Sequence, residues 1–249
     1  MTAQLNENLD PVSVIINVYN EVETIEAEVR ALYKSIILRL PGSEFIVAED
    51  GSTDGTKEII YRLISELGII HSTSDERKGY AKALRDAFNL AKCPYIFFSD
   101  TGNKHDPEDF WKLYCFRKDY GLVIGVKTNR TDQWYRKLLT WCYNKILSLF
   151  FNVNMKDADS GFRIYRRDVV QKVFNENWVY KELIASEITL RVIYSGFRIK
   201  EVPVFYKQRK GQSRGLPLKK IPSVICKVLF NFPKLRRIIF DPLYNADNE

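Results

Sequence analysis

The sequence has no run of about 18 apolar residues, the length that a transmembrane helix needs. It opens on polar, mildly acidic residues, so we expect a flexible N-terminus over residues 1–11 and no signal peptide. Low-complexity stretches and internal repeats are also missing. The chain of 249 residues, with 45% hydrophobic and 13% aromatic content, is long enough for one large globular domain with a sizeable core.

Cysteines in close spacing are missing too. The four cysteines lie far apart, without a C-x-x-C pair, at Cys93, Cys115, Cys142 and Cys226. This pattern argues against a disulfide or zinc framework and predicts reduced, mostly buried cysteines of a cytosolic protein. Neither G-x-G-x-x-G nor a P-loop lysine motif occurs, which argues against a dinucleotide site or a P-loop ATP site.

Acidic residues are missing from one long segment near the C-terminal end. Residues 207–237 contain ten Lys or Arg and no Asp or Glu, whereas the whole chain carries +7, so the rest carries 7 − 10 = −3. This asymmetry suggests an anionic partner such as a membrane surface, a phosphate or a nucleic acid. We do not expect nucleic acid, because the segment lacks a recognition motif and the main body is acidic.

Strand-like and helix-like patterns alternate along the chain. Strands are predicted at residues 12–18, 44–48, 69–71, 95–98, 122–126 and 199–206. Helices are predicted at 20–38, up to about 67, at 79–91, from 107, and at 133–151, 167–174 and 181–194. For the first helix, Asn20 and Glu23 have capping-box spacing. The alternation predicts an α/β fold with a mainly parallel sheet.

Polar turns follow three of the predicted strands. The stretch 95–109 passes from a buried strand through a polar turn to a helix start, where Asp106 suits the N-cap and Pro107 the first helical position. Asp100 ends this strand, and Asp50 follows the strand at 44–48. Because parallel strands end at one edge of a sheet, these acids and the turn 19–21 predict a nucleotide-sized crevice.

A diphosphate in this crevice would need positive charge. A divalent cation on Asp100 could supply it, and so could basic side chains. The candidates are Arg77, Lys78, Arg163, Arg209 and Lys210, each of which could instead be a solvated surface charge.

Five motifs together resemble a known family. They are NVYNE (17–21), EDGSTDGT (49–56), SDTGNKHDPED (99–109), DADSGFRIYRR (157–167) and the stretch 187–213. In this order and spacing they resemble the family 2 glycosyltransferases, in particular the dolichyl-phosphate-mannose-synthase-like branch, which acts on polyprenyl phosphates.

The resemblance implies a GT-A fold, a Rossmann-like sheet flanked by helices, with a catalytic domain at 12–215. The composition of residues 216–249 predicts a separate basic amphipathic helical segment. The resemblance also implies a UDP- or GDP-sugar donor, Mg²⁺ or Mn²⁺, and inversion at the anomeric carbon. By position, it gives the donor site as Tyr19, Glu21, Asp50, Arg209, Lys210 and Ser213, to which Lys78 is added as a phosphate-binding cation. It gives the catalytic residues as Asp100, Asp157 and Arg163, and Asp157 with residues 160–163 matches the family's acceptor-side loop.

Three positions depart from the family pattern. Asn17 stands where the family usually has proline, and Glu49 replaces an aspartate. Gly102 replaces the second acid of the family's Asp-x-Asp metal motif.

The metal prediction therefore involves Asp100 and Asn103, with a weaker metal dependence than is usual in the family. Mg²⁺ can use one carboxylate and the donor's phosphates. Asp157 could supply another oxygen, or Lys104 could take over part of the metal's charge. His105 lies beside this turn, but a single histidine makes a poor metal site, so we expect a surface or capping role.

The acceptor decides whether a base is needed. A lipid phosphate is ionised near neutral pH and needs no strong base, whereas a hydroxyl acceptor would normally need a carboxylate. Asp157 or Asp159 could serve, or they could cap the loop. The leading hypothesis is transfer to a polyprenyl phosphate. The alternatives are transfer to a glycan or other hydroxyl, and a degenerate sugar-nucleotide-binding protein.

The segment 216–240 mixes apolar and basic residues, as an interfacial helix on anionic lipid would. Pro217, Pro222 and Pro233 are expected to break it into short helices. We expect a cytoplasmic protein held peripherally at the cytosolic membrane face. The segment could instead pack on the body or on another subunit of a homo-oligomer. The aromatic residues near 134–143 could likewise face lipid or belong to the core.

Overall fold

The computed structural model describes residues 9–129, 134–174, 178–179, 183–207 and 221–240. Within these ranges the strands are β1 (Val12–Val18), β2 (Glu44–Glu49), β3 (Ile70–Ser72), β4 (Tyr95–Asp100), β5 (Leu122–Thr128), β6 (Phe162–Arg166) and β7 (Ile199–Phe205). The helices are α1 (Ile25–Ser35), α2 (Thr56–Leu67), α3 (Tyr80–Leu90), α4 (Phe110–Tyr114), α5 (Trp134–Phe151), α6 (Arg167–Val173), α7 (Ile184–Tyr194) and α8 (Ile221–Phe240). Short 3-10 helices form η1 (Ile37–Arg39) and η2 (Pro107–Asp109).

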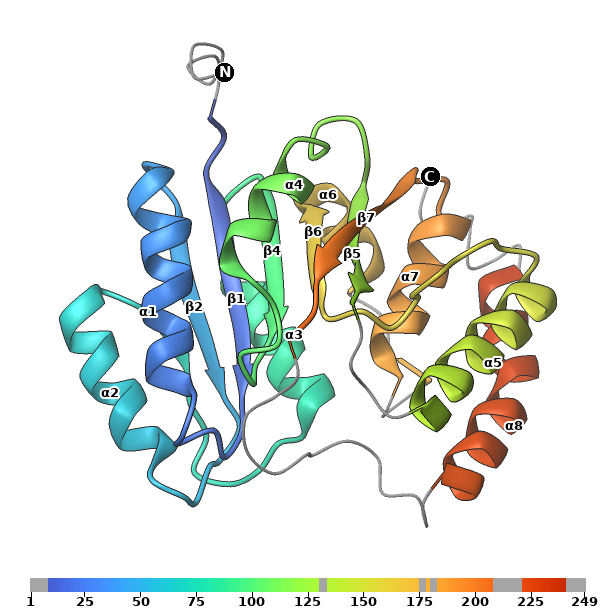
Figure 1. The fold of residues 1–249 in the computed structure, drawn as a ribbon, viewed down its shortest axis with the longest axis horizontal. Helices are drawn as coiled ribbons and strands as arrows, with labels where there is room; N and C mark the ends of the chain where they lie inside the picture. Colours follow the sequence, from blue (N-terminus) through green and yellow to red (C-terminus); the bar gives the residue numbers. More distant parts are fainter. Residues whose placement is uncertain (1–8, 130–133, 175–177, 180–182, 208–220, 241–249) are drawn as a thin grey trace.

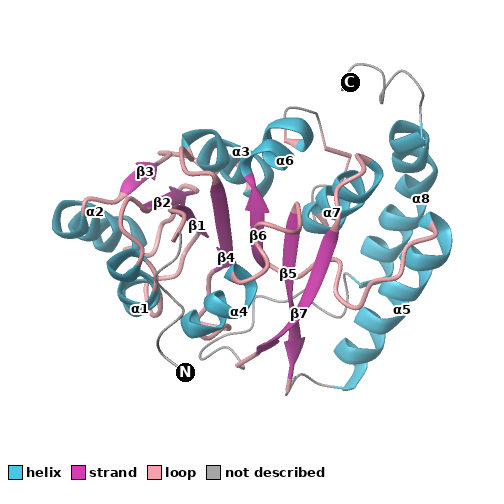
Figure 2. Ribbon diagram, turned by 90° about the horizontal axis from the view of Figure 1, so that it is seen from above, coloured by secondary structure: helices cyan, strands magenta, loops and turns pink. Residues whose placement is uncertain are grey.

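The strands of the described ranges form one seven-stranded sheet in the order β3-β2-β1-β4-β6-β5-β7. Most neighbouring strands are parallel, and β6 runs antiparallel to both β4 and β5. Helices cover both faces of the sheet (Figures 1 and 2). The predicted α/β class and mainly parallel sheet are therefore confirmed.

Strand β6 was missed by the sequence analysis, which assigned only a turn before the helix at 167. Its side chains alternate between the two sheet faces, as period-2 strand geometry requires. Phe162 and Ile164 pack with the helices on one face, and Tyr165 packs on the other. Only five residues long and rich in arginine and aromatic residues, this strand gives a weak sequence signal.

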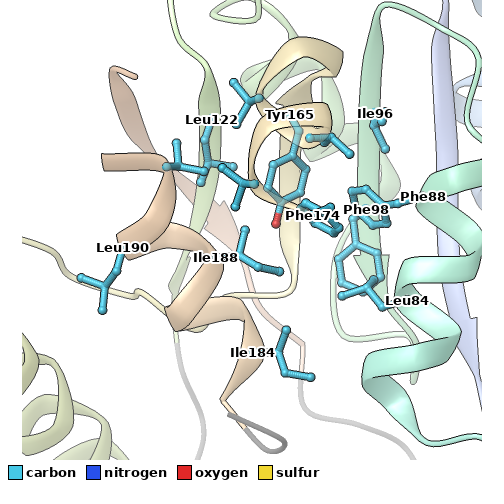
Figure 3. Packing of buried hydrophobic residues seen from close by; sticks show 14 of the residues in the cluster. Leu84, Phe88, Ile96, Phe98, Leu122, Tyr165, Phe174, Ile184, Ile188 and Leu190 are labelled. Atoms are coloured by element: carbon cyan, nitrogen blue, oxygen red, sulfur yellow. The ribbon is translucent and has the colours of Figure 1, made fainter. Parts of the chain in front are cut away.

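Each face of the sheet has its own hydrophobic core. One core joins the sheet to α1, α2 and α4, and the other joins it to α3, α6 and α7. Figure 3 shows the second core, where Phe88 of α3 stacks on Phe174 with ring centroids 4.3 Å apart. Tyr165 of β6 meets Phe88 edge-on at 5.5 Å. These contacts fix α3 against the strands that carry the site.

Helix α1 has its N-cap at Thr24, four residues after the N-cap that the capping-box pattern predicted. Asn20 is not the N-cap, because it lies in the left-handed region with a φ of 54°. Its side-chain oxygen accepts the backbone N–H of Thr53 at 2.7 Å. The loop after β1 is thus tied to the loop after β2, and the helix starts at Ile25 after Thr24.

Helix α8 is continuous from Ile221 to Phe240, so the predicted break into short helices is wrong for residues 221–240. Pro222 lies in the first turn, where a helical N–H needs no partner. Pro233 lies inside the helix. There, burial of Phe232, Leu235 and Ile239 offsets the lost hydrogen bond. Pro217 lies outside the described residues.

Smaller predictions have mixed outcomes. Asp106 caps the turn that starts at Pro107 by accepting the N–H of Glu108 at 3.1 Å, as predicted. Cys93 is buried, but Cys115 and Cys226 are exposed, so the cysteines are not mostly buried. Residues 1–8 of the predicted flexible N-terminus lie outside the described residues, and Asp10 binds Arg117 at 2.7 Å.

Candidate active site

Strands β1, β2 and β4 end at one edge of the sheet, where the structure has a cavity of about 220 Å³. In the strand register, Asn17 of β1 lies between Ala48 of β2 and Asp100 of β4. The cavity is lined by Asn17, Val18, Tyr19, Glu21, Asp50, Arg77, Tyr80, Ala83, Asp100, Thr101 and Lys104. The sequence prediction of a crevice at the carboxyl ends of these strands agrees with this placement.

Asp50 anchors the loop that leads into α3. Its Oδ1 accepts the backbone N–H groups of Lys78 at 2.7 Å and Gly79 at 2.9 Å. Gly51 allows the loop to come this close, because a Cβ at this position would lie 2.5 Å from the carbonyl carbon of Glu76. The buried Asp50 carboxylate is thus both a wall of the cavity and the support of its neighbouring loop.

The two basic residues of that loop lie in different places relative to the cavity. Lys78 does not line the cavity, since its ammonium pairs with Asp86 of α3 at 2.7 Å. Arg77 lies in the wall instead, with its guanidinium 4.2 Å from the centre of the Tyr19 ring. The guanidinium lies over the ring face as a cation–π pair, and the outer face of such a pair can stack on a nucleobase. The structure therefore places Arg77 at the cavity and Lys78 behind it.

Asp100 lies where the cavity meets the loop 157–161. Its backbone N–H donates to the carbonyl of Gly161 at 2.7 Å, and its Oδ1 accepts the hydroxyl of Tyr80 at 3.2 Å. A Cβ on Gly161 would lie 1.9 Å from Oδ2 of Asp100. The carboxylate therefore rests against the backbone of Gly161, a contact that only glycine permits. Gly161 belongs to the predicted acceptor-side loop, so the two halves of the predicted site touch at Asp100.

Glu28 of α1 binds the backbone of the turn after β4. Its Oε2 accepts the N–H of Gly102 at 2.9 Å and that of Asn103 at 3.2 Å. Burial raises the pKa of Glu28 to about 7, although these two N–H groups oppose the shift. Sequence analysis missed Glu28, and the available signal was an acid on the apolar stripe formed by Ile25, Val29 and Leu32.

The two residues predicted to bind metal lie in different surroundings. Asp100 borders the cavity, whereas the Asn103 side chain is exposed and does not line it. Lys104, the next residue, does line it. His105 is buried and stacks on Phe162 at 4.7 Å, so the expected surface or capping role is wrong. Burial lowers the pKa of His105 to about 3, and the charges of nearby lysines add to this shift.

Arg163, predicted to be catalytic, is not among the residues that line the cavity. It is fully buried, and its guanidinium donates to the carbonyl oxygens of Ser160, Ala158 and Ala185 and to the hydroxyl of Thr189. On strand β6 the side chain points toward α7 and not into the cavity. It therefore holds the loop 157–161 against α7, and a direct catalytic role for Arg163 stays a prediction.

The acids of that loop lie beside Lys127 of β5. Asp157 is buried, and its carboxylate lies 3.5 Å from the Lys127 ammonium. Its backbone N–H donates to Glu201 of β7 at 3.1 Å. Burial raises the pKa of Asp159 to about 7, and the charges of Lys127 and Arg163 oppose this shift. The predicted acceptor side thus places the Lys127 cation next to the carboxylates of Asp157 and Asp159.

Residues 13–174 match the protein family described as "Glycosyl transferase family 2". The chain belongs to glycosyl transferase family 2. The matched part runs from β1 to α6, so it contains Asp50, Asp100 and the loop 157–161. The predicted Arg209, Lys210 and Ser213 lie outside both the matched part and the described residues.

Two curated proteins illustrate the relatives of this family 2 chain. It is 31% identical over 211 residues to "Glycosyltransferase AglD" of Haloferax volcanii, a match that covers 80% of this chain and 33% of that protein. It is 26% identical over 193 residues to an undecaprenyl-phosphate 4-deoxy-4-formamido-L-arabinose transferase of Aeromonas hydrophila, covering 76% and 59%. The chain thus spans between a third and about three-fifths of these relatives.

Solved structures show the fold. Glucosyl-3-phosphoglycerate synthase from Mycobacterium tuberculosis, in complex with Mn²⁺, UDP and phosphoglyceric acid, superposes with a TM-score of 0.67 at 16% identity, over 90% of this chain and 78% of that one. The mannosyltransferase PcManGT from Pyrobaculum calidifontis, with GDP-Man and Mn²⁺, gives 0.66 at 19% identity, over 97% and 70%. The predicted GT-A fold of this family 2 chain is therefore confirmed.

Those structures raise the question of whether this site suits a divalent cation. The described residues contain no cluster of three His, Cys, Asp or Glu side chains that could hold a metal ion. Asp100 offers one carboxylate at the point where β4 ends. This donor set fits a hard cation that arrives on a nucleotide's phosphates and keeps most of its water, since Mg²⁺ needs as little as one carboxylate from the protein.

Proposed function

We propose that this family 2 chain is an inverting glycosyltransferase that moves a sugar from UDP or GDP to a polyprenyl phosphate at the cytosolic membrane face. The observation that carries the proposal is the contact of Asp100 with Gly161, which joins the cavity to the loop 157–161. A relative whose name includes undecaprenyl phosphate supports the choice of acceptor.

The cavity would take the nucleotide. The stacked pair of Tyr19 and Arg77 would offer the base a flat, cationic surface, and Glu21 and Asp50, which line the same cavity, would accept hydrogen bonds from the ribose hydroxyls. Mg²⁺ or Mn²⁺ bound to the donor's phosphates would offset the charge that develops on the leaving diphosphate. Asp100 is the carboxylate placed to hold such an ion. Arg209, Lys210 and Ser213 would close over the phosphates.

The chemistry needs no proton transfer when the acceptor is a phosphate. A phosphate oxygen of the acceptor attacks the anomeric carbon, the bond to the β-phosphate oxygen breaks, and the nucleoside diphosphate leaves. Lys127 beside Asp157 would attract the acceptor phosphate. The loop 157–161 and the cavity need only hold the acceptor phosphate in line with the bond that breaks. Positioning and charge stabilisation therefore supply most of the rate acceleration.

Asparagine substitutions distinguish the two acceptor classes. We expect Asp157→Asn and Asp159→Asn each to lower transfer to polyprenyl phosphate by less than about tenfold, because no base is needed. If a hydroxyl is the acceptor, loss of the base should lower transfer by about 10²- to 10⁴-fold. The measurement is the rate of sugar transfer from a panel of UDP- and GDP-sugars into polyprenyl phosphate in vesicles, with soluble glycans as competing acceptors. Product on glycans alone would contradict the proposed acceptor.

Helices α5 and α8 support the membrane part of the proposal. They lie side by side at the end of the molecule away from α1 and α2 (Figures 1 and 2). Neither helix contains an acidic residue, and both carry Lys and Arg. Large exposed hydrophobic residues line both: Trp134, Leu138, Trp141, Ile146, Leu149, Leu229, Phe230 and Phe240. An apolar face with only positive charges suits an anionic lipid surface. No helix in the described ranges is long and apolar enough to cross a bilayer.

This face predicts lipid binding. Trp134→Ser combined with Leu149→Ser is expected to weaken binding to vesicles of anionic phospholipid by about tenfold or more, because both side chains lose apolar burial. Leu38→Ser is the matched control, since Leu38 is also exposed, at 67%, but lies on η1. Co-sedimentation with vesicles measures the effect. Equal loss in the control, or no loss in the double variant, would contradict a membrane role for this face.

A further inference from the structure

The turn after β4 is built without a second acid. Gly102, which replaces the second carboxylate of the family motif, has a φ of 104°, a conformation that side-chain-bearing residues rarely adopt. Its N–H is bound to Glu28 at 2.9 Å. An aspartate would be strained in this backbone conformation. The turn therefore differs from the family motif in its backbone as well as in the missing carboxylate.

The carboxylates that line the cavity already have partners. Asp50 accepts two backbone N–H groups, and Asp100 accepts the Tyr80 hydroxyl. Glu21 accepts the hydroxyl of Thr24 at 3.1 Å. Within the described ranges these acids do not gather into a three-residue metal group. Asp159 lies close enough to Asp100 for the two charges to interact, but without a group of three acids among the described residues a divalent cation would have only a weak protein site here.

Lys104 offers positive charge in the same place. It lines the cavity together with Asp100, and its ammonium forms no ion pair with any residue that the structure describes. The backbone around it is fixed, because its carbonyl accepts the N–H of Lys207 at 2.7 Å and the next residue, His105, is buried against Phe162. Arg77, the other cation of the cavity wall, lies over Tyr19.

We propose that Lys104 binds the diphosphate of the donor directly and supplies the positive charge that a second metal-binding acid would otherwise recruit. Donor binding then continues when divalent cations are removed. This inference rests on the proposed function, since it assumes a nucleoside diphosphate in the cavity. An ammonium placed at a phosphate acts as a compact point charge with three donors, the role of lysine in other phosphate sites.

The test is isothermal titration of the purified chain with UDP and with GDP, in Mg²⁺ and in EDTA. For the nucleotide that binds, we expect Kd in EDTA to be within about threefold of Kd in Mg²⁺. Lys104→Met should raise Kd about 10- to 100-fold in both buffers, the size of a lost charged hydrogen bond. Lys104→Arg, which keeps the charge, should recover most of the affinity. Lys112→Met, on α4 and paired with Asp109, is the control and should not change Kd.

The other outcomes are distinct. Binding by the wild type that disappears in EDTA, with Lys104→Met unaffected in Mg²⁺, would overturn the proposal and leave the proposed glycosyltransferase standing. Equal affinity of Lys104→Met and wild type in EDTA would also overturn it. Absence of UDP and GDP binding in both buffers would overturn the proposed function itself. Circular dichroism of each variant confirms that a change in Kd reflects the site and not unfolding.

Discussion

Replacing Gly161 by alanine is expected to lower sugar transfer by about 100-fold or more while the protein remains folded. The new Cβ would lie 1.9 Å from Oδ2 and 2.1 Å from Cγ of Asp100, so the carboxylate has to move away. The backbone at Gly161 does not lie in the left-handed region, so alanine itself is tolerated there. A displacement of about 1 Å at a reacting centre can cost about 100-fold in rate.

The control for this variant is Gly68→Ala. Gly68 ends α2 with a φ of 66°, and a Cβ there meets nothing within 4 Å. Alanine should lower the free energy of unfolding by about 1 kcal/mol through backbone strain and leave the transfer rate unchanged. Initial rates and thermal unfolding of both variants separate the two effects. Full activity in Gly161→Ala would contradict the role given to the Asp100–Gly161 contact.

The second large effect is on stability. Arg163→Ala is expected to lower the free energy of unfolding by about 3–5 kcal/mol, because it empties a fully buried position and leaves several carbonyl oxygens without donors. The loop 157–161 loses its attachment to α7, so transfer activity should fall as well. Urea unfolding followed by circular dichroism measures the change.

Arg166→Ala is the matched control on the same strand. Its guanidinium is partly exposed and pairs with Asp168 at 2.5 Å. Such surface pairs contribute about 1 kcal/mol or less. A similar cost for both variants would contradict the structural role of Arg163. A stable but inactive Arg163→Ala protein would instead restore the catalytic role that the sequence predicted.

The features that depend on strand geometry alone could be predicted from the sequence. Buried apolar runs located the central strands, and Asp50 and Asp100 could be placed together because parallel strands end at one edge. The family motifs at 17–21, 49–56 and 99–109 each lie at the end of a predicted strand or in the turn after it, so their positions in the fold follow from the predicted strands. For these reasons the fold and the position of the crevice were accessible without coordinates, while the roles of the donor-site residues stay predictions.

The errors concern contacts between distant segments. Glu28 was missed because its role depends on α1 packing under a turn that lies 74 residues further along the chain. The burial of Arg163 was not foreseen because a motif does not reveal which strand face an arginine occupies. The sequence analysis named both Asn103 and Lys104 for this turn, but it could not show that Lys104 lines the cavity and Asn103 does not, because that depends on the positive φ angles at 102 and 103. Asn20 was predicted to be a helix N-cap, but its side chain instead joins the loop after β1 to the loop after β2.

The most direct test of the account is the melting temperature of the purified protein with a panel of nucleoside diphosphates. Binding to the folded state raises the melting temperature by mass action. The account predicts a rise with UDP or with GDP that is lost in a variant whose cavity wall is altered at Tyr19 and Asp50 (Tyr19→Ala, Asp50→Asn) and kept in Leu38→Ser. No rise with any nucleoside diphosphate, or an equal rise in the cavity variant, would contradict a donor site at the ends of β1, β2 and β4.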